Sequence, residues 1–152
     1  MQKPTLLFAS LFILLVSYIS QAQENRHYNL KNKLAVEGYD PVAYFTSNSA
    51  KEGSKNHTVS YKGVVYYFEN EANKETFKKN PAKYVPQYGG WCAYAMGESG
   101  DKVKIDPKTF KIKDGKLYLF YNFRGNNTLV LWNKDEKSLK SKADKNWQTI
   151  LK

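Results

Sequence analysis

The chain has 152 residues, enough for one domain that folds around its own hydrophobic core without disulfide bonds. Its formal net charge is +10, but the lysines are spread along the whole chain and arginine occurs only as Arg26 and Arg124. This pattern is typical of a solvated surface and argues against a nucleic-acid site. Cys92 is the single cysteine, which excludes an internal disulfide and a site built from several thiolates.

The first 22 residues have the pattern of a cleaved signal peptide. Lys3 precedes an apolar run over residues 6–19, and Ser20 and Ala22 fit signal-peptidase cleavage before Gln23. The apolar run is shorter than the roughly 20 residues of a membrane-spanning helix, so we expect no stable membrane anchor after cleavage. The expected location is the periplasm or the cell exterior, which further argues against nucleic acid as a partner.

Residues 23–33 are polar and unpatterned, which predicts a mobile leader before a single domain over residues 34–152. Three short motifs in that domain predict helix starts. In each, Asp or Asn supplies a capping oxygen, proline takes the first helical position, and an aromatic residue follows three positions later and faces inward. The motifs are Asp40-Pro41-Val42-Ala43-Tyr44, Asn80-Pro81-Ala82-Lys83-Tyr84 and Asp106-Pro107-Lys108-Thr109-Phe110.

Two hairpins are predicted from turn signals between alternating apolar residues. The first covers residues 59–68 and turns at Lys62-Gly63, which sets His57 opposite Phe68 at the border of the apolar face. The second turns at Asp114-Gly115 and is expected to have one buried and one solvated face. Its expected cross-strand pairs are Ile112 with Leu117 and Phe110 with Leu119, while Lys111, Lys113, Lys116 and Tyr118 are expected on the solvated face.

Two helices complete the predicted fold. Asn70 is expected to cap a helix that runs to about Lys79, with Phe77 as its apolar anchor. Apolar residues recur at helical spacing near the end of the chain and predict an amphipathic helix, at Leu139, Ala143, Trp147 and Ile150. Because hairpins and helices are grouped, we predict the α+β class, with small antiparallel hairpins packed against short helices and a C-terminal amphipathic helix.

Several of these motifs together resemble the YHS domain family. The resemblance rests on Asp40-Pro41-Val42, Tyr61-Lys62-Gly63, Tyr66-Tyr67-Phe68, Phe77 and Asn80-Pro81-Ala82-Lys83-Tyr84. It extends to exported bacterial YHS-domain proteins through Pro86-Gln87-Tyr88-Gly89-Gly90-Trp91-Cys92-Ala93, Asp106-Pro107, Asp114-Gly115-Lys116-Leu117-Tyr118-Leu119 and Ala143-Asp144-Lys145-Asn146-Trp147. The resemblance implies a YHS-like fold, and it implies metal binding through cysteines, as in metal transporters and metallochaperones.

The chain departs from the metal-binding members of that family at their cysteine positions. Where those members have Asp-Pro-Val-Cys, this chain has Ala43, and where they have two cysteines after Tyr-Tyr-Phe, it has Glu69 and Asn73. A metal ion would therefore have to be held by other residues.

The candidate functional site is the stretch from Pro86 to Ser99. It contains Gly89-Gly90, where the backbone can turn sharply or approach a ligand closely, followed by Cys92 in the expected first turn of a short helix. Unpaired N–H groups in such a turn stabilise a thiolate. Met96 stands four residues later, so Cys92 and Met96 could hold copper as Cu(I), with His57 as a third ligand. The leading hypothesis is an exported YHS-type binding protein with a metal ion such as copper near Cys92.

Two other functions remain open at the same stretch. Cys92 could act in a thiol-based oxidoreductase or redox sensor through a sulfenic acid, or it could be an inert buried thiol. No hydrolytic Ser, His and Asp set is recognisable, so an enzyme is not the favoured interpretation. The third hypothesis is a structural or partner-binding module, or an aromatic pocket for a small ligand. Composition alone does not distinguish an aromatic pocket from an aromatic core. The pocket residues would be Tyr88, Gly89, Gly90, Trp91 and Tyr94.

Overall fold

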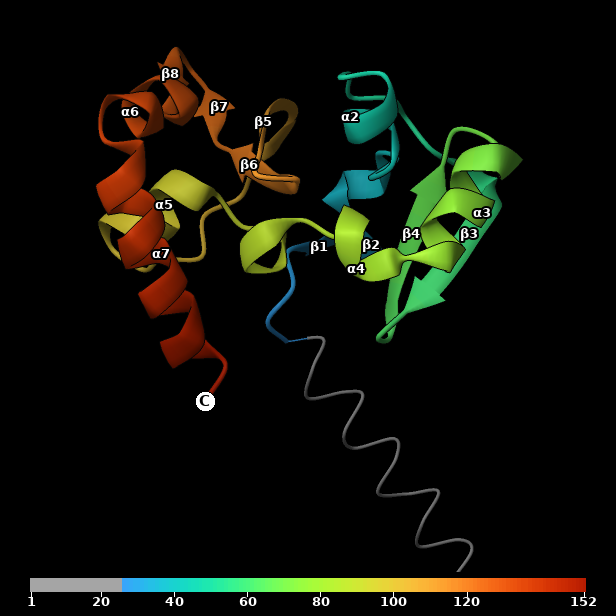
Figure 1. The fold of residues 1–152 in the computed structure, drawn as a ribbon, viewed down its shortest axis with the longest axis horizontal. Coiled ribbons are helices and arrows are strands. Elements are labelled where there is room, and N and C mark those ends of the chain that lie inside the picture. Colours follow the sequence, from blue (N-terminus) through green and yellow to red (C-terminus); the bar gives the residue numbers. More distant parts are fainter. Residues whose placement is uncertain (1–25) are drawn as a thin grey trace, which may run out of the picture.

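The computed structural model describes residues 26–152 (Figure 1). The predicted signal peptide and its cleavage site lie outside these residues. The strands are β1 (Leu30–Lys31), β2 (Leu34–Ala35), β3 (Ser54–Tyr61), β4 (Val64–Phe68), β5 (Asp106–Lys113), β6 (Lys116–Phe120), β7 (Asn122–Phe123) and β8 (Asn126–Asn127). The helices are α2 (Ala43–Thr46), α3 (Glu71–Lys79), α4 (Pro81–Tyr84), α5 (Ala93–Glu98), α6 (Thr128–Lys134) and α7 (Glu136–Ile150), with short 3₁₀ turns η1 (Val36–Gly38) and η2 (Gln87–Gly90). This combination confirms the predicted α+β class.

The largest sheet of the described residues has the strand order β1-β2-β4-β3. β3 and β4 form the predicted antiparallel hairpin, and β1 pairs with β2 in the same sense. The sheet is not purely antiparallel, because β2 runs parallel to β4 with Leu34 opposite Val65. Short pairings elsewhere join β5 to β6 and β7 to β8.

The first hairpin has the predicted register near its turn but not at His57. Tyr61 pairs with Val64 and Val59 pairs with Tyr66, as expected. A bulge then shifts the register, so that Phe68 pairs with Ser54. His57 consequently has no partner position in β4, and its Nδ1 lies 3.1 Å from a carboxylate oxygen of Glu71 on α3. The prediction that His57 stands opposite Phe68 is therefore wrong, because a bulge cannot be read from alternation alone.

The second hairpin has the predicted cross-strand pairs, and Lys113 and Lys116 are exposed as predicted, but its expected solvated face is covered at Tyr118. Ile112 pairs with Leu117 and Phe110 with Leu119. Tyr118, expected on the solvated face, is only 1% exposed, since the ring of Trp132 from α6 packs 5.8 Å from its ring. The prediction of one solvated face is wrong at Tyr118 because the C-terminal helices cover that position.

The predicted helix starts have three different outcomes. Asp40 accepts hydrogen bonds from the N–H groups of Val42 and Ala43 at 2.8 and 3.2 Å, as a capping residue would, but α2 begins at Ala43 and not at Pro41 as predicted. The segment after Asn80 is helical as predicted, although the Asn80 side chain makes no capping bond. Asp106 begins strand β5 instead of a helix, because it pairs with Phe120 of β6, although its carboxylate still accepts from the Lys108 N–H and the Thr109 hydroxyl.

The other two predicted helices are confirmed. Asn70 accepts a bond from the Asn73 N–H at the start of α3, and Phe77 of that helix is buried. α7 buries Leu139 and Ala143, and its later apolar residues pack on the same cluster. Gly97 allows α5 to approach α7 closely, because a Cβ there would lie 2.5 Å from the carbonyl oxygen of Leu139.

Residues 27–33, expected to belong to a mobile leader, are part of the fold. Leu30 and Lys31 form β1, and the Asn29 N–H donates to the carbonyl oxygen of Gly89 at 2.8 Å. The carbonyl oxygen of His27 accepts from the indole N–H of Trp91, also at 2.8 Å. The polar composition of this segment does not predict its packing on the rest of the fold, because backbone groups take part in each of these hydrogen bonds.

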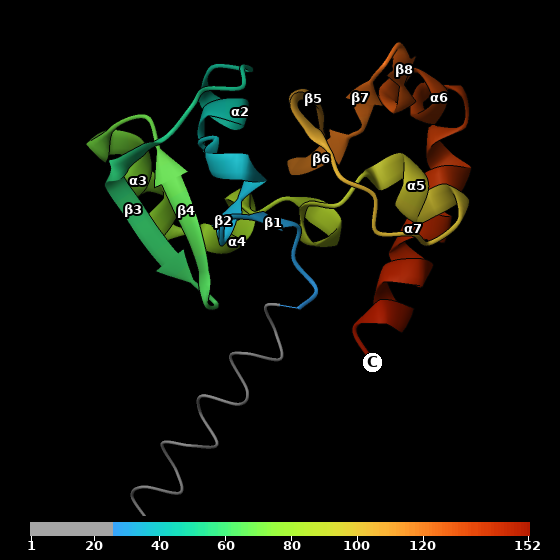
Figure 2. The ribbon, with the colours of Figure 1, turned by 180° about the vertical axis from the view of Figure 1, so that it is seen from behind.

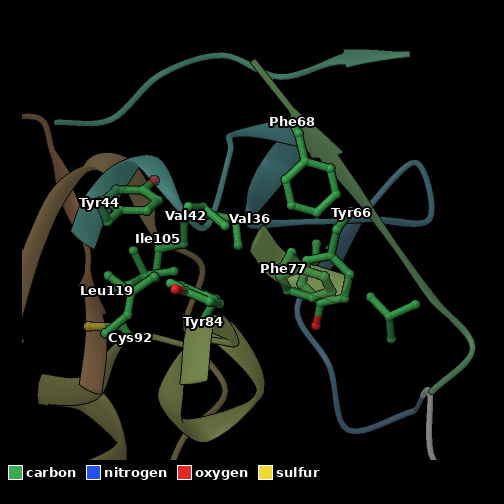
Figure 3. Packing of buried hydrophobic residues seen from close by; sticks show 13 residues of the cluster. Val36, Val42, Tyr44, Tyr66, Phe68, Phe77, Tyr84, Cys92, Ile105 and Leu119 are labelled. Carbon is green, nitrogen blue, oxygen red and sulfur yellow. The ribbon is translucent and has the colours of Figure 1, made fainter. Parts of the chain in front are cut away.

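The hydrophobic core joins the two sides of the molecule. Figures 1 and 2 show β3, β4 and α3 on one side and α5, α6 and α7 on the other, with α4 and η2 between them. One buried cluster runs from Phe68 and Phe77 through Tyr84 to Leu119 and Cys92 (Figure 3). The Tyr44 hydroxyl donates to the carbonyl oxygen of Pro107 at 2.8 Å, which adds a buried polar link.

Candidate functional site

The predicted glycine pair lies in a left-handed turn against the N-terminal segment. The backbone φ angle is +54° at Tyr88, +61° at Gly89 and +83° at Gly90. A Cβ on Gly89 would lie 2.7 Å from the carbonyl oxygen of His27 and 2.9 Å from a ring carbon of Trp147. Glycine is therefore needed here for two reasons, the left-handed backbone and the close approach of another part of the chain.

Tyr88 and Trp91 hold this turn in place on either side of the glycine pair. The Tyr88 hydroxyl donates to a carboxylate oxygen of Asp144 on α7 at 2.8 Å. Burial, and then the adjacent Asp144 carboxylate, raise the pKa of Tyr88, so the phenol remains a neutral donor at physiological pH. Trp91 uses its indole N–H to bind the His27 carbonyl. Both side chains therefore have structural hydrogen bonds that connect η2 to its surroundings.

A groove of about 550 Å³ opens beside Tyr88 and Gly89. Its walls come from distant parts of the chain, because residues 26–28, the β3–β4 turn, residues 85–89 and the end of α7 all contribute. Trp147 forms an aromatic wall, with ring centroids 6.4 Å from both His27 and Tyr88. Volumes of roughly 300–1,000 Å³ are usual for small-molecule sites. The groove is therefore large enough for an organic ligand.

The charged side chains along the groove are all cationic. Arg26, Lys62 and Lys152 line it, and within residues 26–152 no Asp or Glu side chain does. None of the three side chains forms an ion pair with another described residue, whereas other lysines on the surface pair with carboxylates, such as Lys74 with Glu71. The side chains along the groove therefore carry a net positive charge.

Cys92 lies away from this groove and is fully buried. It stands at the residue before α5, not inside the helix, with φ −58° and ψ 118°. Its sulfur lies 3.4 Å from the Thr128 hydroxyl oxygen and accepts from the Tyr121 N–H at 3.4 Å. The thiol has an exposed fraction of 0%, and Figure 3 shows it beside Leu119 at one end of the core. A thiol in this position is a packing group unless the fold opens locally.

Tyr94, predicted to line the same pocket as Tyr88, belongs to a different depression. This second hollow, of about 250 Å³, is lined by Cys92, Tyr94, Ala95 and Thr128 among others, although the Cys92 side chain itself has an exposed fraction of 0%. Tyr88 and Gly89 line the larger groove, whereas Gly90 and Trp91 are not among its lining residues. The predicted set of five binding residues is thus divided between two places.

The three proposed metal ligands do not converge. Met96 is buried in the second core cluster among α5, α6 and α7, whereas Cys92 belongs to the first. His57 lies on β3, which both ribbon views place on the opposite side of the molecule from α5, and it contacts Glu71. Within residues 26–152, no group of three or more His, Cys, Asp and Glu side chains is arranged to hold a metal ion. The donor set does not fit copper.

Ala43, Glu69 and Asn73 are gathered around one carboxylate. Asp40 has an exposed fraction of 0% and accepts from the N–H of Ala43 at 3.2 Å and of Glu69 at 2.9 Å. The Asn73 side-chain amide donates to the same carboxylate at 2.7 Å. A hydrogen-bonded cluster thus ties α2, β4 and α3 together at this point, where no thiolate is present.

Sequence reasoning missed most of the groove. Gly89 was the one useful signal, because a glycine pair predicts close approach of another group. Arg26 and His27 fall in the segment expected to be a mobile leader, and Trp147 was assigned to the core. Lys62 was seen only as a turn residue, since charge in a turn has an ordinary explanation in solvation.

Within residues 26–152, no helix is long and apolar enough to cross a membrane. No family model, curated protein or solved structure matches the chain.

Proposed function

We propose that this chain is an exported, YHS-type binding protein that holds a small organic molecule in the groove beside Tyr88 and Gly89. The observation that carries the proposal is the groove itself, about 550 Å³ in volume and lined by parts of the chain far apart in sequence. Its aromatic wall offers apolar contact, and its polar rim offers orientation, which is the usual composition of a ligand site. The groove is lined by Gly89, one of the two glycines that the sequence indicates as a point of close approach.

The YHS-type assignment is supported by the cluster around Asp40. The three positions that the resemblance equates with cysteines, in two separate segments, all donate hydrogen bonds to Asp40. Two of the donors are the backbone N–H groups of Ala43 and Glu69, and the third is the Asn73 side-chain amide. Such convergence of the three positions is expected if the chain shares the family's backbone arrangement. Export to the periplasm or beyond is supported by the signal-peptide pattern of the first 22 residues.

Copper binding and thiol chemistry at Cys92 receive less support. The copper hypothesis needs Cys92, Met96 and His57 within one coordination sphere. Cys92 and Met96 instead belong to different core clusters, and His57 contacts Glu71. The redox hypothesis needs a thiol that a substrate can reach, and the Cys92 side chain is buried.

The proposal is tested with two fluorescent dyes that share one apolar frame. These are N-phenyl-1-naphthylamine, which is neutral, and 8-anilinonaphthalene-1-sulfonate, which adds a negative charge. We expect at least one of them to bind the 23–152 protein saturably and to lose most of its affinity in Gln87→Phe, which fills the groove. Gln148→Phe is the matched control, because Gln148 is exposed on α7 outside the groove lining. Absence of saturable binding, or equal affinity of the two variants, would contradict the proposal.

A further inference from the structure

We propose that the ligand of this groove is a small organic anion, an aromatic or similarly flat molecule that bears a carboxylate, sulfonate or phosphate group. The inference rests on the proposed function, because it names the chemical class that the same groove would select. It is carried by two independent observations, the unpaired cations around the groove and an unpaired hydrogen-bond donor on His27.

The cations give the groove its charge preference. Arg26, Lys62 and Lys152 come from three separate segments that meet at the groove, and none forms an ion pair within the described residues. Two of them contact uncharged side chains. Lys62 lies 5.8 Å from the centre of the Tyr61 ring, and the Arg26 Nε donates to the His27 ring at 2.9 Å. Partial enclosure of the groove reduces the screening of these charges by solvent, so an anion placed there gains more than on an open surface.

His27 adds a hydrogen-bond donor, and the ring nitrogen that carries the proton can be deduced. Its Nε2 accepts the hydrogen bond from Arg26 Nε, because an arginine nitrogen can only donate. Partial burial, then the charges of Lys102 and Arg26, lower the pKa of His27, so the ring is neutral at physiological pH. The single ring proton must then lie on Nδ1.

That Nδ1 N–H group has no acceptor. The Nδ1 atom is buried and is the one such side-chain nitrogen or oxygen of residues 26–152 without a hydrogen-bond partner. Buried donors are nearly always paired, and leaving one unpaired is costly. Because His27 is one of the lining residues, an anionic oxygen in the groove would be a suitable acceptor once a turn of the ring brings Nδ1 to the groove surface.

The apolar part of the ligand is indicated by the aromatic wall. The Trp147 ring is in edge contact with both the Tyr88 ring and the His27 ring at centroid distances of 6.4 Å, and Trp147 lines the groove. A flat ring system can pack against this wall while its charged group faces the cations. A purely inorganic ion would leave most of the 550 Å³ to water.

The test compares the charged and neutral dyes in charge-removing variants. In Arg26→Gln and Lys62→Gln, we expect the affinity for 8-anilinonaphthalene-1-sulfonate to fall about two- to fivefold each, the range for a single partly exposed charge pair. His27→Phe keeps the ring but removes the donor, and we expect a similar fall. The affinity for N-phenyl-1-naphthylamine should not change in any of the three. Lys55→Gln is the matched control, because Lys55 is exposed on β3 and does not line the groove.

Salt gives a second readout. Raising the ionic strength from roughly 0.02 to 0.5 M should weaken sulfonate binding and leave the neutral dye unaffected. If the variants alter both dyes equally or neither, or if Lys55→Gln acts like Lys62→Gln, the anion preference is refuted while the groove remains a ligand site. If Gln87→Phe affects neither dye, both the proposed function and this inference are refuted.

Discussion

Replacing Gly89 by alanine tests the junction between the glycine turn and the N-terminal segment. The chain offers a matched control in Gly115, which has the same left-handed backbone, with φ +69° against +61° at Gly89. A Cβ on Gly115 would meet nothing within 4 Å, whereas a Cβ on Gly89 would lie 2.7 Å from the His27 carbonyl oxygen. The two substitutions therefore share the conformational cost and differ only in the steric conflict.

The expected magnitudes follow from these distances. Alanine at Gly115 should cost about 1 kcal/mol, because the left-handed backbone disfavours an L residue and the loss of flexibility in the unfolded chain offsets part of this. At Gly89, overpacking against His27 and Trp147 adds about 1–3 kcal/mol, which gives roughly 2–4 kcal/mol in total. Part of the strain can be relieved if residues 26–29 detach, but the bonds from Asn29 and to His27 are then lost at about 1 kcal/mol each.

The measurement is equilibrium unfolding in urea, followed by tryptophan fluorescence, for the wild type and both variants. We expect Gly89→Ala to lower the free energy of unfolding by at least about 1 kcal/mol more than Gly115→Ala does. Equal losses in the two variants would refute the close packing of residues 26–29 on the glycine turn, and with it one wall of the groove.

Three further predictions concern the core. Asp40→Ala removes the acceptor of four hydrogen bonds at a fully buried site. It should lower the free energy of unfolding, measured in urea, by about 3–5 kcal/mol. A decrease below about 1 kcal/mol would show that this cluster does not stabilise the fold. Cys92 should resist a bulky aromatic disulfide reagent in the native protein and react fully in denaturant, so immediate native reaction would contradict its burial. Burial raises the pKa of Tyr66, so the folded protein keeps the phenol proton at pH values where the unfolded chain, with a pKa of about 10, loses it. The contribution of this proton to stability is therefore lost as the pH rises above about 10. Unfolding free energies at about pH 9 and 11 should therefore fall less in Tyr66→Phe than in the wild type, and equal falls would contradict this sign.

The sequence was informative wherever a local pattern determines local structure. Both hairpins turn at the predicted residues, because Lys62-Gly63 and Asp114-Gly115 are turn signals with a steric cause. Asn70 begins α3 as expected, and the apolar spacing of α7 was read correctly. These features depend on residues a few positions apart.

The wrong predictions depend on contacts made across the fold. Asp106-Pro107 resembles a helix start, but pairing with Phe120 makes Asp106 the beginning of a strand. Tyr118 alternates with apolar residues as a solvated residue would, but it is buried because Trp132 packs on it. His57 was placed near the candidate site because nothing in the sequence says on which side of the molecule β3 lies.

The candidate site was only partly predictable for the same reason. Gly89 marks a close approach, but which segment approaches it is a tertiary question. The answer is residues 27–29, which make backbone hydrogen bonds to Gly89 and Trp91 together with side-chain contacts from His27, Tyr28 and Asn29. This mixture leaves no apolar pattern in the sequence. Cys92 drew attention as a rare and reactive residue type, yet its chemical importance depends on exposure, which the structure places at 0%.

The most direct test of the central claim is to map where the anionic dye binds. Two-dimensional ¹⁵N NMR spectra of the 23–152 protein would be recorded during titration with 8-anilinonaphthalene-1-sulfonate. We predict that the largest changes occur at the Gly89 amide and the Trp147 indole N–H, with the Tyr94 amide unaffected. Changes centred on Tyr94 and Thr128, above Cys92, or no saturable changes at all, would contradict the assignment of the groove as the ligand site.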